Sequence, residues 1–274
     1  PHFLCIGAVK AVTTWLHSHL ETHPDVDMGP FKETNFFNSI FCTNQAWTTG
    51  YIQSIACDGV RSRIQQHHRA VDWEEIELLA QCADPRRIFT EPWYRNIFEP
   101  RRSGGRICGD ISPSYSTLPL DGVHYARTVV GAAKIIYMIR DPHARMISHI
   151  QMNVGRRPEA AVTESDWHAL CEHSFILDAN DYRLGIENWT RVFGEENVLF
   201  VPFKDVRSRP DAVMAAVEAH VGLRPHRYAN LHGKVHESVR YRVPETVTAR
   251  VSEIVADQRA YLAERFDADF IARI

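Results

Sequence analysis

Segment 7–14 places one lysine and two threonines between a short apolar run and an expected helix, and it reads GAVKAVTT. In a strand–loop–helix unit, backbone N–H groups and the positive end of the helix favour an anion. Lys10 adds a mobile charge, and Thr13 and Thr14 add donors. The segment therefore predicts a phosphate-binding loop, although an ordinary turn with an exposed lysine is the alternative. It is not a Walker A loop, which needs Gly directly before Lys in GxxxxGK[ST].

Segment 140–148 reads RDPHARMIS and directly follows the most convincing strand pattern of the chain, 134–139. Ligands of doubly wound sheets lie at the carboxyl ends of strands, where Arg140 is expected. Ser148 lies two turns into a helix that we expect to begin at Pro142. An arginine fork and a hydroxyl suit a second phosphate group. A surface pair of Arg140 with Asp141 is the alternative interpretation.

Segment 32–37 reads KETNFF, a charged pair followed by two aromatic residues. Burial of Glu33 beside Phe36 and Phe37 would favour its protonated form and make the carboxylate a stronger general base. The alternative is a surface salt pair of Lys32 and Glu33 beside core aromatic residues.

The elements that must position these residues alternate along the chain. We expect strands at 3–8, 106–110, 134–139 and 198–203, and helices at 13–21, 142–153, 180–193, 210–221 and 244–266. Continuous apolar strands that alternate with helices indicate a parallel α/β sheet covered on both faces. Stretch 38–100 interrupts this alternation, is rich in aromatic residues, and has a helical pattern near 72–82. We interpret it as a helical insertion without a core of its own.

The composition is ordinary for a globular protein. The 274 residues are 45% apolar and 24% charged, which excludes wholesale disorder, a collagen-like chain and a coiled coil. A net charge of −3 gives no global basic field for nucleic acid. The longest apolar run, 129–139, is interrupted by Lys134 and is too short to span a bilayer.

The six cysteines form no CxxC pair, so no structural zinc site is expected. Cys5 and Cys108 lie in apolar runs and are predicted to be buried thiols, which fits a reducing cytoplasm. A disulfide between Cys42 and Cys57 stays open. We interpret the histidines at 67, 68, 232 and 236 as a solvated surface and expect no metal site.

Taken together, these segments resemble the sulfotransferases that use 3′-phosphoadenosine 5′-phosphosulfate (PAPS). The 5′-phosphosulfate loop of that family typically reads GxxKAGTT, and its 3′-phosphate element reads RDPxxRxxSxY/H, as in RDPHARMISH at 140–149. The other similar segments are KExxFF at 32–37, WYxxLF at 93–98, GEKSPSY at 109–115, and a basic closing loop at 233–244. They span nearly the whole chain in family order. The glycan-type branch, with the heparan sulfate N- and 3-O-sulfotransferases, and bacterial relatives are most similar.

The resemblance implies a P-loop-like, three-layer α/β fold, with a central parallel sheet flanked by helices, in a single domain over 1–274. It implies transfer of a sulfuryl group from PAPS to a hydroxyl, less readily an amine, without a metal. Glu33 would be the base, and Lys10 would neutralise charge on the leaving phosphate oxygen. The implied nucleotide contacts are Lys10, Ala11, Val12, Thr13, Thr14, Trp15, Arg140, Ser148, Lys234 and Arg240.

Four positions depart from the family pattern. Val12 replaces a glycine, and Asn35 replaces a histidine found in some relatives. Asp110 and Ile111 replace Glu and Lys of GEKSPSY, which removes a polar contact to the acceptor. A β-branched residue does not easily adopt a positive φ and crowds an approaching phosphate. Either the loop has an ordinary φ at Val12, or nucleotide binding is weakened or lost.

Two other functions stay open. One is a P-loop kinase or NTPase with 135–141 as a Walker B strand, against which the missing GK[ST] argues. The other is an inactive nucleotide-binding homologue, for which Val12 is the main argument. We expect a small-molecule or carbohydrate acceptor, no nucleic-acid or membrane partner, and a bacterial cytoplasmic enzyme. Aromatic side chains between Phe36 and Trp93 are available for the acceptor pocket.

Overall fold

A single parallel sheet organises the protein. The computed structural model describes residues 1–42, 48–65, 73–233 and 241–274. Within these residues the strand order is β2-β3-β1-β4-β5, and every strand pair is parallel. The strands are β1 (Phe3–Gly7), β2 (Val26–Asp27), β3 (Ile107–Ile111), β4 (Lys134–Ile139) and β5 (Val198–Pro202). The four expected strands are confirmed, whereas the two-residue edge strand β2 was not predicted.

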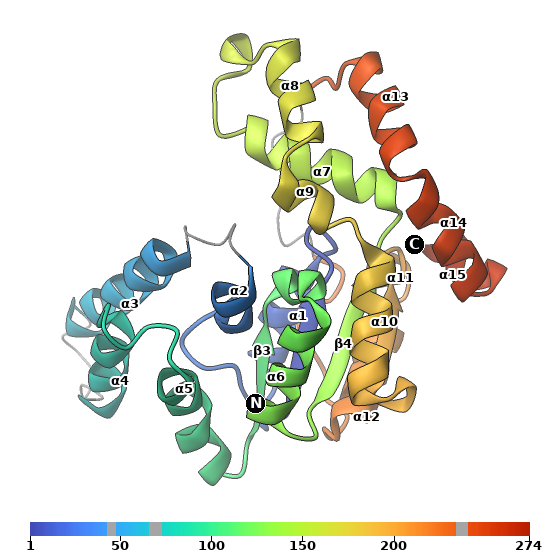
Figure 1. The fold of residues 1–274 in the computed structure, drawn as a ribbon. Helices are drawn as coiled ribbons and strands as arrows, with labels where there is room; N and C mark the ends of the chain where they lie inside the picture. The colour runs from blue at the N-terminus through green and yellow to red at the C-terminus, as the bar shows by residue number, and fades with distance from the viewer. Residues whose placement is uncertain (43–47, 66–72, 234–240) are drawn as a thin grey trace.

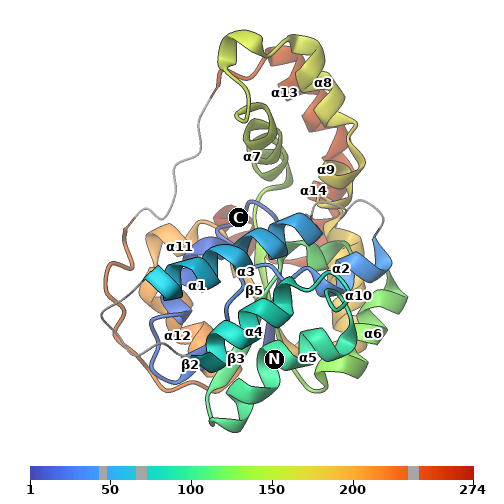
Figure 2. The ribbon, with the colours of Figure 1, turned by 90° about the vertical axis from the view of Figure 1, so that its left-hand side faces the viewer.

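Helices cover both faces of the sheet, which confirms the three-layer α/β fold. α1 (Thr13–Leu20) and α12 (Pro210–Val221) lie on one face, and α6 (Leu120–Val130) and α10 (Tyr182–Phe193) lie on the other (Figure 2). The helix expected at 244–266 is interrupted at Val255 and forms two helices, α13 (Glu245–Ile254) and α14 (Ala256–Arg265). The remaining short elements are η1 (Pro113–Thr117), η2 (Glu159–Ala161), η3 (Glu195–Asn197), α11 (Asp205–Ser208) and α15 (Ala268–Arg273).

The sheet is the centre of the main apolar core. Every residue of β1 is buried, as the unbroken apolar run predicted. Gly109 on β3 faces the ring of Phe3, and a Cβ there would lie 1.9 Å from the ring. A larger residue at this position would therefore displace the buried Phe3 ring.

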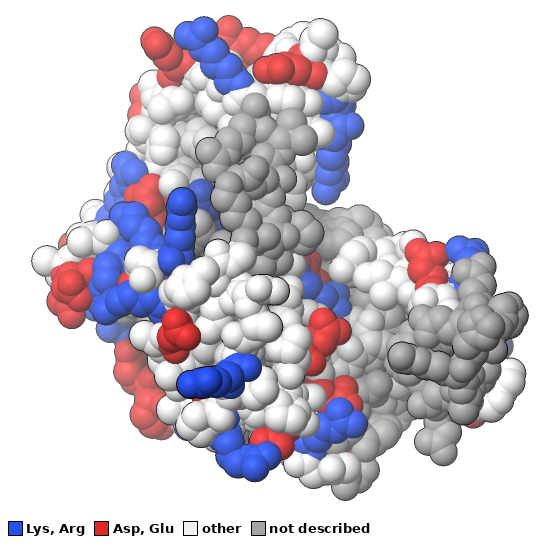
Figure 3. All heavy atoms as spheres, turned by 180° about the vertical axis from the view of Figure 1, so that it is seen from behind, with Lys and Arg blue, Asp and Glu red and all other residues white. Residues whose placement is uncertain are grey.

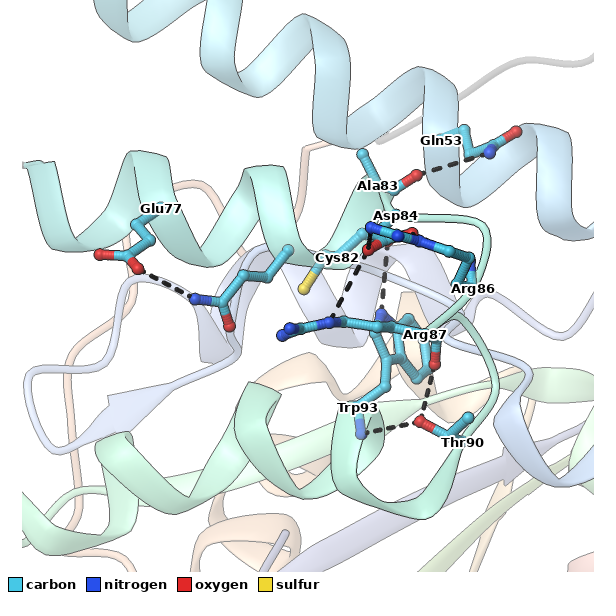
Figure 4. A network of polar contacts seen from close by, with 10 residues as sticks. Gln53, Glu77, Cys82, Ala83, Asp84, Arg86, Arg87, Thr90 and Trp93 are labelled. Atoms are coloured by element: carbon cyan, nitrogen blue, oxygen red, sulfur yellow. Dashed lines mark hydrogen bonds and ion pairs between the residues drawn. The ribbon is translucent and has the colours of Figure 1, made fainter.

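The described residues of the stretch 38–100 are mainly helical. It contains α2 (Phe36–Phe41), α3 (Thr48–Gln65), α4 (Trp73–Ala83) and α5 (Glu91–Ser103), and α4 is the helix predicted near 72–82. Figure 4 shows the turn between α4 and α5, where Asp84 accepts from the backbone and guanidinium of Arg86 at 2.9–3.0 Å. Trp93 Nε1 donates to the Cys82 carbonyl at 3.4 Å. Buried side chains of these helices join the core cluster of the sheet: Ile52, Ala56, Leu79, Cys82, Trp93, Tyr94, Ile97 and Phe98.

A second apolar cluster lies in a helical lobe made by α7 (Pro142–Val154), α8 (Glu164–Cys171), α9 (Ser174–Asp178) and α13. The lobe stands above the sheet in Figure 1, beyond the carboxyl end of β4, from which α7 continues. Its buried members are Met146, Ile150, Val154, Trp167, Cys171, Ile176, Val247, Val251 and Val255. The helix that follows Arg140 is thus anchored at its far end by the lobe.

Charges of both signs are distributed over the surface. In Figure 3, Lys and Arg are most frequent on the side where α11, α14 and α15 lie. Several of these side chains form ion pairs, for example Arg259 with Asp141 and Arg273 with Asp205. In the part of the chain that the structure describes, no helix is both long and apolar enough to cross a membrane.

Candidate functional site

The loop after β1 presents unused backbone donors. Within the described residues, the N–H groups of Lys10, Val12, Thr13 and Thr14 donate to no protein atom. The N–H of Ala11 is used within the loop, because it donates to the Ala8 carbonyl at 3.0 Å. Val12 is the N-cap of α1 and provides no side-chain cap. Unsatisfied N–H groups at a helix N-terminus attract an anion, so the loop has the open donors that a phosphate-binding loop needs, and phosphate binding itself stays a prediction.

The backbone of this loop is left-handed at two positions. Val12 has φ 58° and ψ 26°, and Lys10 has φ 67°. Of the two alternatives for Val12, an ordinary φ is therefore wrong. Left-handed residues turn successive N–H groups to one side, which forms an anion-binding concavity. Gly7 has φ 153°, and a Cβ there would lie 2.9 Å from the Pro113 carbonyl, so only glycine fits.

Lys10 joins the loop to the segments around Arg140 and Glu33. Its Nζ lies 3.6 Å from Met152 Sδ on α7, and its carbonyl accepts from Arg140 Nη1 at 2.7 Å. Burial lowers the pKa of Lys10, and the charge of Arg140 lowers it further, whereas Glu33 opposes both. Lys10, Arg140 and Glu33 thus share one electrostatic neighbourhood.

Arg140 is fixed at the carboxyl end of β4. The Tyr182 hydroxyl donates to the Arg140 carbonyl at 2.8 Å and accepts from its N–H at 3.2 Å. The guanidinium lies 4.4 Å from the centroid of the Phe203 ring. Ser148 is half-buried on α7, which begins two residues after Arg140. Sequence reasoning assigned no role to Tyr182 or Phe203, because both belong to other elements of the chain.

Arg145 is a fully buried cation without a carboxylate partner among the described residues. It donates to Asn180 Oδ1 at 2.7 Å, to the Ile176 carbonyl at 3.2 Å and to the Val9 carbonyl at 3.5 Å. Burial lowers the pKa of its guanidinium to about 10. A buried charge without a counter-ion is costly, so an anion nearby would stabilise it. Sequence reasoning missed this residue, although its place one turn into the helix after Arg140 was a usable signal.

Glu33 forms an ion pair with Lys32, and its side chain is 27% exposed. The rings of Phe36 and Phe37 turn into the core, so the expected burial of Glu33 beside them is only partial. The Glu33 N–H donates to the Ile111 carbonyl at 3.1 Å. Glu33 has φ 63°, an unusual conformation for a residue other than glycine. Such strained residues cluster at functional sites.

The other predicted residues divide into three groups. Ala11 and Thr13 are buried in the loop, and Thr14 is half-buried. Trp15 is only 4% exposed, and its Nε1 donates to the Leu231 carbonyl at 3.1 Å. Lys234 and Arg240 lie outside the described residues.

The cysteines are thiols in the structure. Cys5 and Cys108 are buried, as predicted, and Cys42 and Cys57 are not joined by a disulfide. Burial raises the pKa of Cys5 to about 12, so this thiol stays protonated. Among the described residues, no group of three or more His, Cys, Asp or Glu side chains is placed to hold a metal ion.

Comparison with known proteins gives a consistent result. A sequence model described as "Sulfotransferase family" matches residues 1–227. Human heparan sulfate glucosamine 3-O-sulfotransferase 3B1 is 24% identical over 174 residues, which cover 54% of this chain and 42% of that protein. Mouse bifunctional heparan sulfate N-deacetylase/N-sulfotransferase 4 is 22% identical over 242 residues, which cover 82% of this chain and 23% of that protein. The chain thus spans less than half the length of these relatives.

Solved structures share the fold. A sulfotransferase from Alicyclobacillus acidocaldarius superposes with a TM-score of 0.68 at 18% identity, covering 100% of this chain and 99% of that one. The sulfotransferase domain of the Synechococcus PCC 7002 olefin synthase gives a TM-score of 0.52 at 15% identity, covering 94% of both chains. At these identities the comparison establishes the architecture.

Proposed function

Because the chain belongs to the sulfotransferase family, we propose that it transfers a sulfuryl group from PAPS to a hydroxyl group of a small metabolite or glycan. The observation that carries this proposal is the concentration of unused donors and positive charge at the carboxyl ends of β1 and β4. There the open N–H groups of the loop lie beside Lys10, Arg140 and the buried Arg145. A ligand with two separate anionic groups suits such a surplus.

Each part of the site has a role in this proposal. The loop N–H groups, with Thr13 and Thr14, bind the 5′-phosphate, and Arg140 and Ser148 bind the 3′-phosphate. Lys10 neutralises the charge that develops on the leaving phosphate oxygen. Its contact with Arg140 keeps the loop and the 3′-phosphate residue in a fixed relation.

Glu33 is the proposed base. An aliphatic hydroxyl is barely acidic, so Glu33 takes its proton as the new O–S bond forms. The bond from sulfur to the 5′-phosphate oxygen breaks, and adenosine 3′,5′-bisphosphate leaves. The half-exposed position of Glu33 lets an acceptor approach it from solvent. Before the acceptor binds, Lys32 is the ion-pair partner of this carboxylate.

A kinase or NTPase reading fits the site less well. In that reading, Asp141 at the end of β4 would hold Mg²⁺. Here Asp141 caps α7 by accepting from the Ala144 N–H at 2.8 Å, and it pairs with Arg259 at 2.9 Å. Its oxygens are therefore already used for structure. An inactive nucleotide-binding protein is the second candidate, favoured by the left-handed Val12 in the loop.

The acceptor and the cellular setting are part of the proposal. We infer a carbohydrate or small-molecule acceptor, because the relatives that match in sequence include heparan sulfate sulfotransferases. A bacterial cytoplasm fits the six thiols and a bacterial neighbour in structure. No metal, nucleic acid or membrane enters this scheme.

Ligand-induced stabilisation tests the proposal. Adenosine 3′,5′-bisphosphate at 100 times its Kd should add about 2.7 kcal/mol of stability and raise the Tm. ATP with Mg²⁺ should raise the Tm much less. A larger shift with ATP and Mg²⁺ favours the kinase reading, and no shift with either ligand refutes a nucleotide site. Turnover of PAPS in an acceptor screen then separates an enzyme from an inactive binding protein.

A further inference from the structure

A buried carboxylate lies directly beneath the segment that carries Glu33. Asp110 on β3 is 1% exposed, and within the described residues its four side-chain donors are all hydroxyls. Thr34, Tyr94 and Tyr115 donate to Oδ2 at 2.8, 2.9 and 2.8 Å. Ser112 donates to Oδ1 at 2.8 Å. We refer to these five residues as the hydroxyl cage.

The carboxylate orients the hydroxyls that donate to it, whereas Thr34 Oγ1 and the Tyr115 hydroxyl also lie 2.9 Å apart, and either could donate to the other. A hydroxyl has one proton, so a group that donates to Asp110 can only accept from its other neighbours. Ser112 Oγ accepts from the Asn35 N–H, and the Tyr115 hydroxyl accepts from the Phe36 N–H, both at 3.2 Å. These N–H groups open α2, whose N-cap Asn35 provides no side-chain cap. Two hydroxyls from another segment therefore replace the missing cap.

The tyrosine hydroxyls keep their protons in this setting. Burial raises the pKa of Tyr94 and of Tyr115 well above the ordinary value, and the charge of Asp110 raises both further. Both hydroxyls therefore keep their protons at neutral pH.

The segment held in this way is strained. Glu33 has φ 63° and Asn35 has φ 48°, so two left-handed residues flank Thr34, the member of the cage that lies between them. Residues other than glycine keep such conformations only where their surroundings hold them. On the other side, the Glu33 N–H donates to the Ile111 carbonyl at 3.1 Å. The direction of the Glu33 side chain thus depends on bonds that Asp110 organises.

We propose that Asp110 is a positioning residue, which acts through the hydroxyl cage to hold segment 33–36 in the conformation that directs the Glu33 carboxylate at the acceptor. The inference rests on the proposed function, in which Glu33 is the base. It gives a role to a position where this chain has Asp and the family pattern has Glu.

A matched pair of variants tests the proposal. Tyr115→Phe and Tyr94→Phe each remove one hydroxyl that donates to the same oxygen of Asp110. Both rings are buried, at 0% and 1% exposure. Only the Tyr115 hydroxyl also accepts from the backbone of segment 33–36. Loss of general stability should therefore be similar, whereas any effect on Glu33 should be specific to Tyr115→Phe.

The first measurement is amide hydrogen exchange over segment 33–37 in the protein without ligand. The Phe36 N–H loses its acceptor in Tyr115→Phe, so its exchange should accelerate by about tenfold, the value of one ordinary hydrogen bond. Tyr94→Phe should leave this exchange within about twofold of the wild type, since its hydroxyl touches no N–H of the segment. Equal acceleration in both variants, or none in Tyr115→Phe, overturns the proposal.

The second measurement compares two acceptors, an aliphatic alcohol and a nitrophenol, whose hydroxyl ionises far more readily. A displaced base should lower kcat for the alcohol about tenfold or more in Tyr115→Phe. The nitrophenol should lose little, and affinity for adenosine 3′,5′-bisphosphate should not change. Equal losses with both acceptors indicate a merely structural role and overturn the proposal. If the wild type sulfates neither acceptor, the proposed function fails, and hydrogen exchange still decides whether the cage holds the segment.

Discussion

Replacing Val12 by glycine should change nucleotide affinity more than protein stability. Val12 has φ 58° and ψ 26° and is half-buried against the core. A left-handed conformation costs an L-residue about 1–2 kcal/mol, and glycine removes this cost. Two contributions act in the opposite direction and destabilise the variant. Glycine costs about 0.5–1 kcal/mol in backbone entropy on folding, and removing a half-buried valine side chain costs about 1 kcal/mol. The contributions nearly cancel, so the free energy of unfolding should change by less than about 1 kcal/mol.

The effect on binding should be larger because Val12 is the N-cap residue and directly precedes the open N–H groups of Thr13 and Thr14. Relief of crowding lets a phosphate reach these donors, and one charge-assisted hydrogen bond is worth about 1.5–3 kcal/mol. Ordering a more flexible loop offsets about 0.5–1 kcal/mol of that gain. A net gain of about 1 kcal/mol corresponds to roughly fivefold tighter binding.

Titration calorimetry with adenosine 3′,5′-bisphosphate measures this effect, and urea unfolding measures stability. Val12→Ala is the control, because alanine removes the two methyl groups but keeps the cost of the left-handed conformation. If crowding limits binding, both variants should bind more tightly, and the alanine variant should be the less stable one. Unchanged or weaker binding by Val12→Gly would refute the reasoning.

Three further changes are informative. Arg140→Ala should weaken adenosine 3′,5′-bisphosphate about tenfold or more and adenosine 5′-monophosphate much less; equal losses in calorimetry would show that Arg140 acts only through its bond to the Lys10 carbonyl. Glu33→Gln should lower turnover of an aliphatic alcohol by about 10² to 10⁴ while nucleotide affinity stays constant; wild-type turnover would exclude Glu33 as the base. Burial, and then the charge of Lys32, lowers the pKa of His17 from 6.5 to about 4. As the pH falls, His17 is protonated in the unfolded chain before it is protonated in the folded protein. The free energy of unfolding should therefore fall by up to about 3 kcal/mol between pH 6.5 and about pH 4. Urea unfolding should show that the free energy of unfolding of His17→Gln falls less steeply with decreasing pH than that of the wild type. An identical pH dependence would contradict the lowered pKa of His17.

Local sequence was sufficient for the four longer strands of the sheet and for the loop after β1. After Lys134, strand β4 is a continuous apolar run that is rich in isoleucine, and burial on both faces of a parallel sheet requires such a run. The loop donors follow from chain order alone, because a helix that starts directly after a strand has open N–H groups at its first turn. Arg140 could also be placed from chain order, because it directly follows β4.

Features that depend on distant contacts could not be predicted. The left-handed φ of Val12 contradicts the preference of a β-branched residue, and the fold imposes it. The hydroxyl cage joins Thr34, Tyr94 and the segment 110–115, which meet only after β3 pairs with β1 and α5 packs beside it. The break at Val255 also escaped prediction, because the helical spacing continues through it.

Helix α7 connects the end of β4 to the second apolar cluster, and this links the local unfolding of the lobe to the nucleotide site. Its first residues follow Arg140, whereas Met146, Ile150 and Val154 lie in the apolar cluster of the helical lobe. The lobe therefore cannot open as a separate cooperative unit without loosening the helix that also carries Ser148 and Arg145. A nucleotide that binds only the closed state lowers the population of the open one. Ligand binding at the sheet should thus protect α8 and α13 from proteolysis, although neither helix carries a residue assigned to the nucleotide.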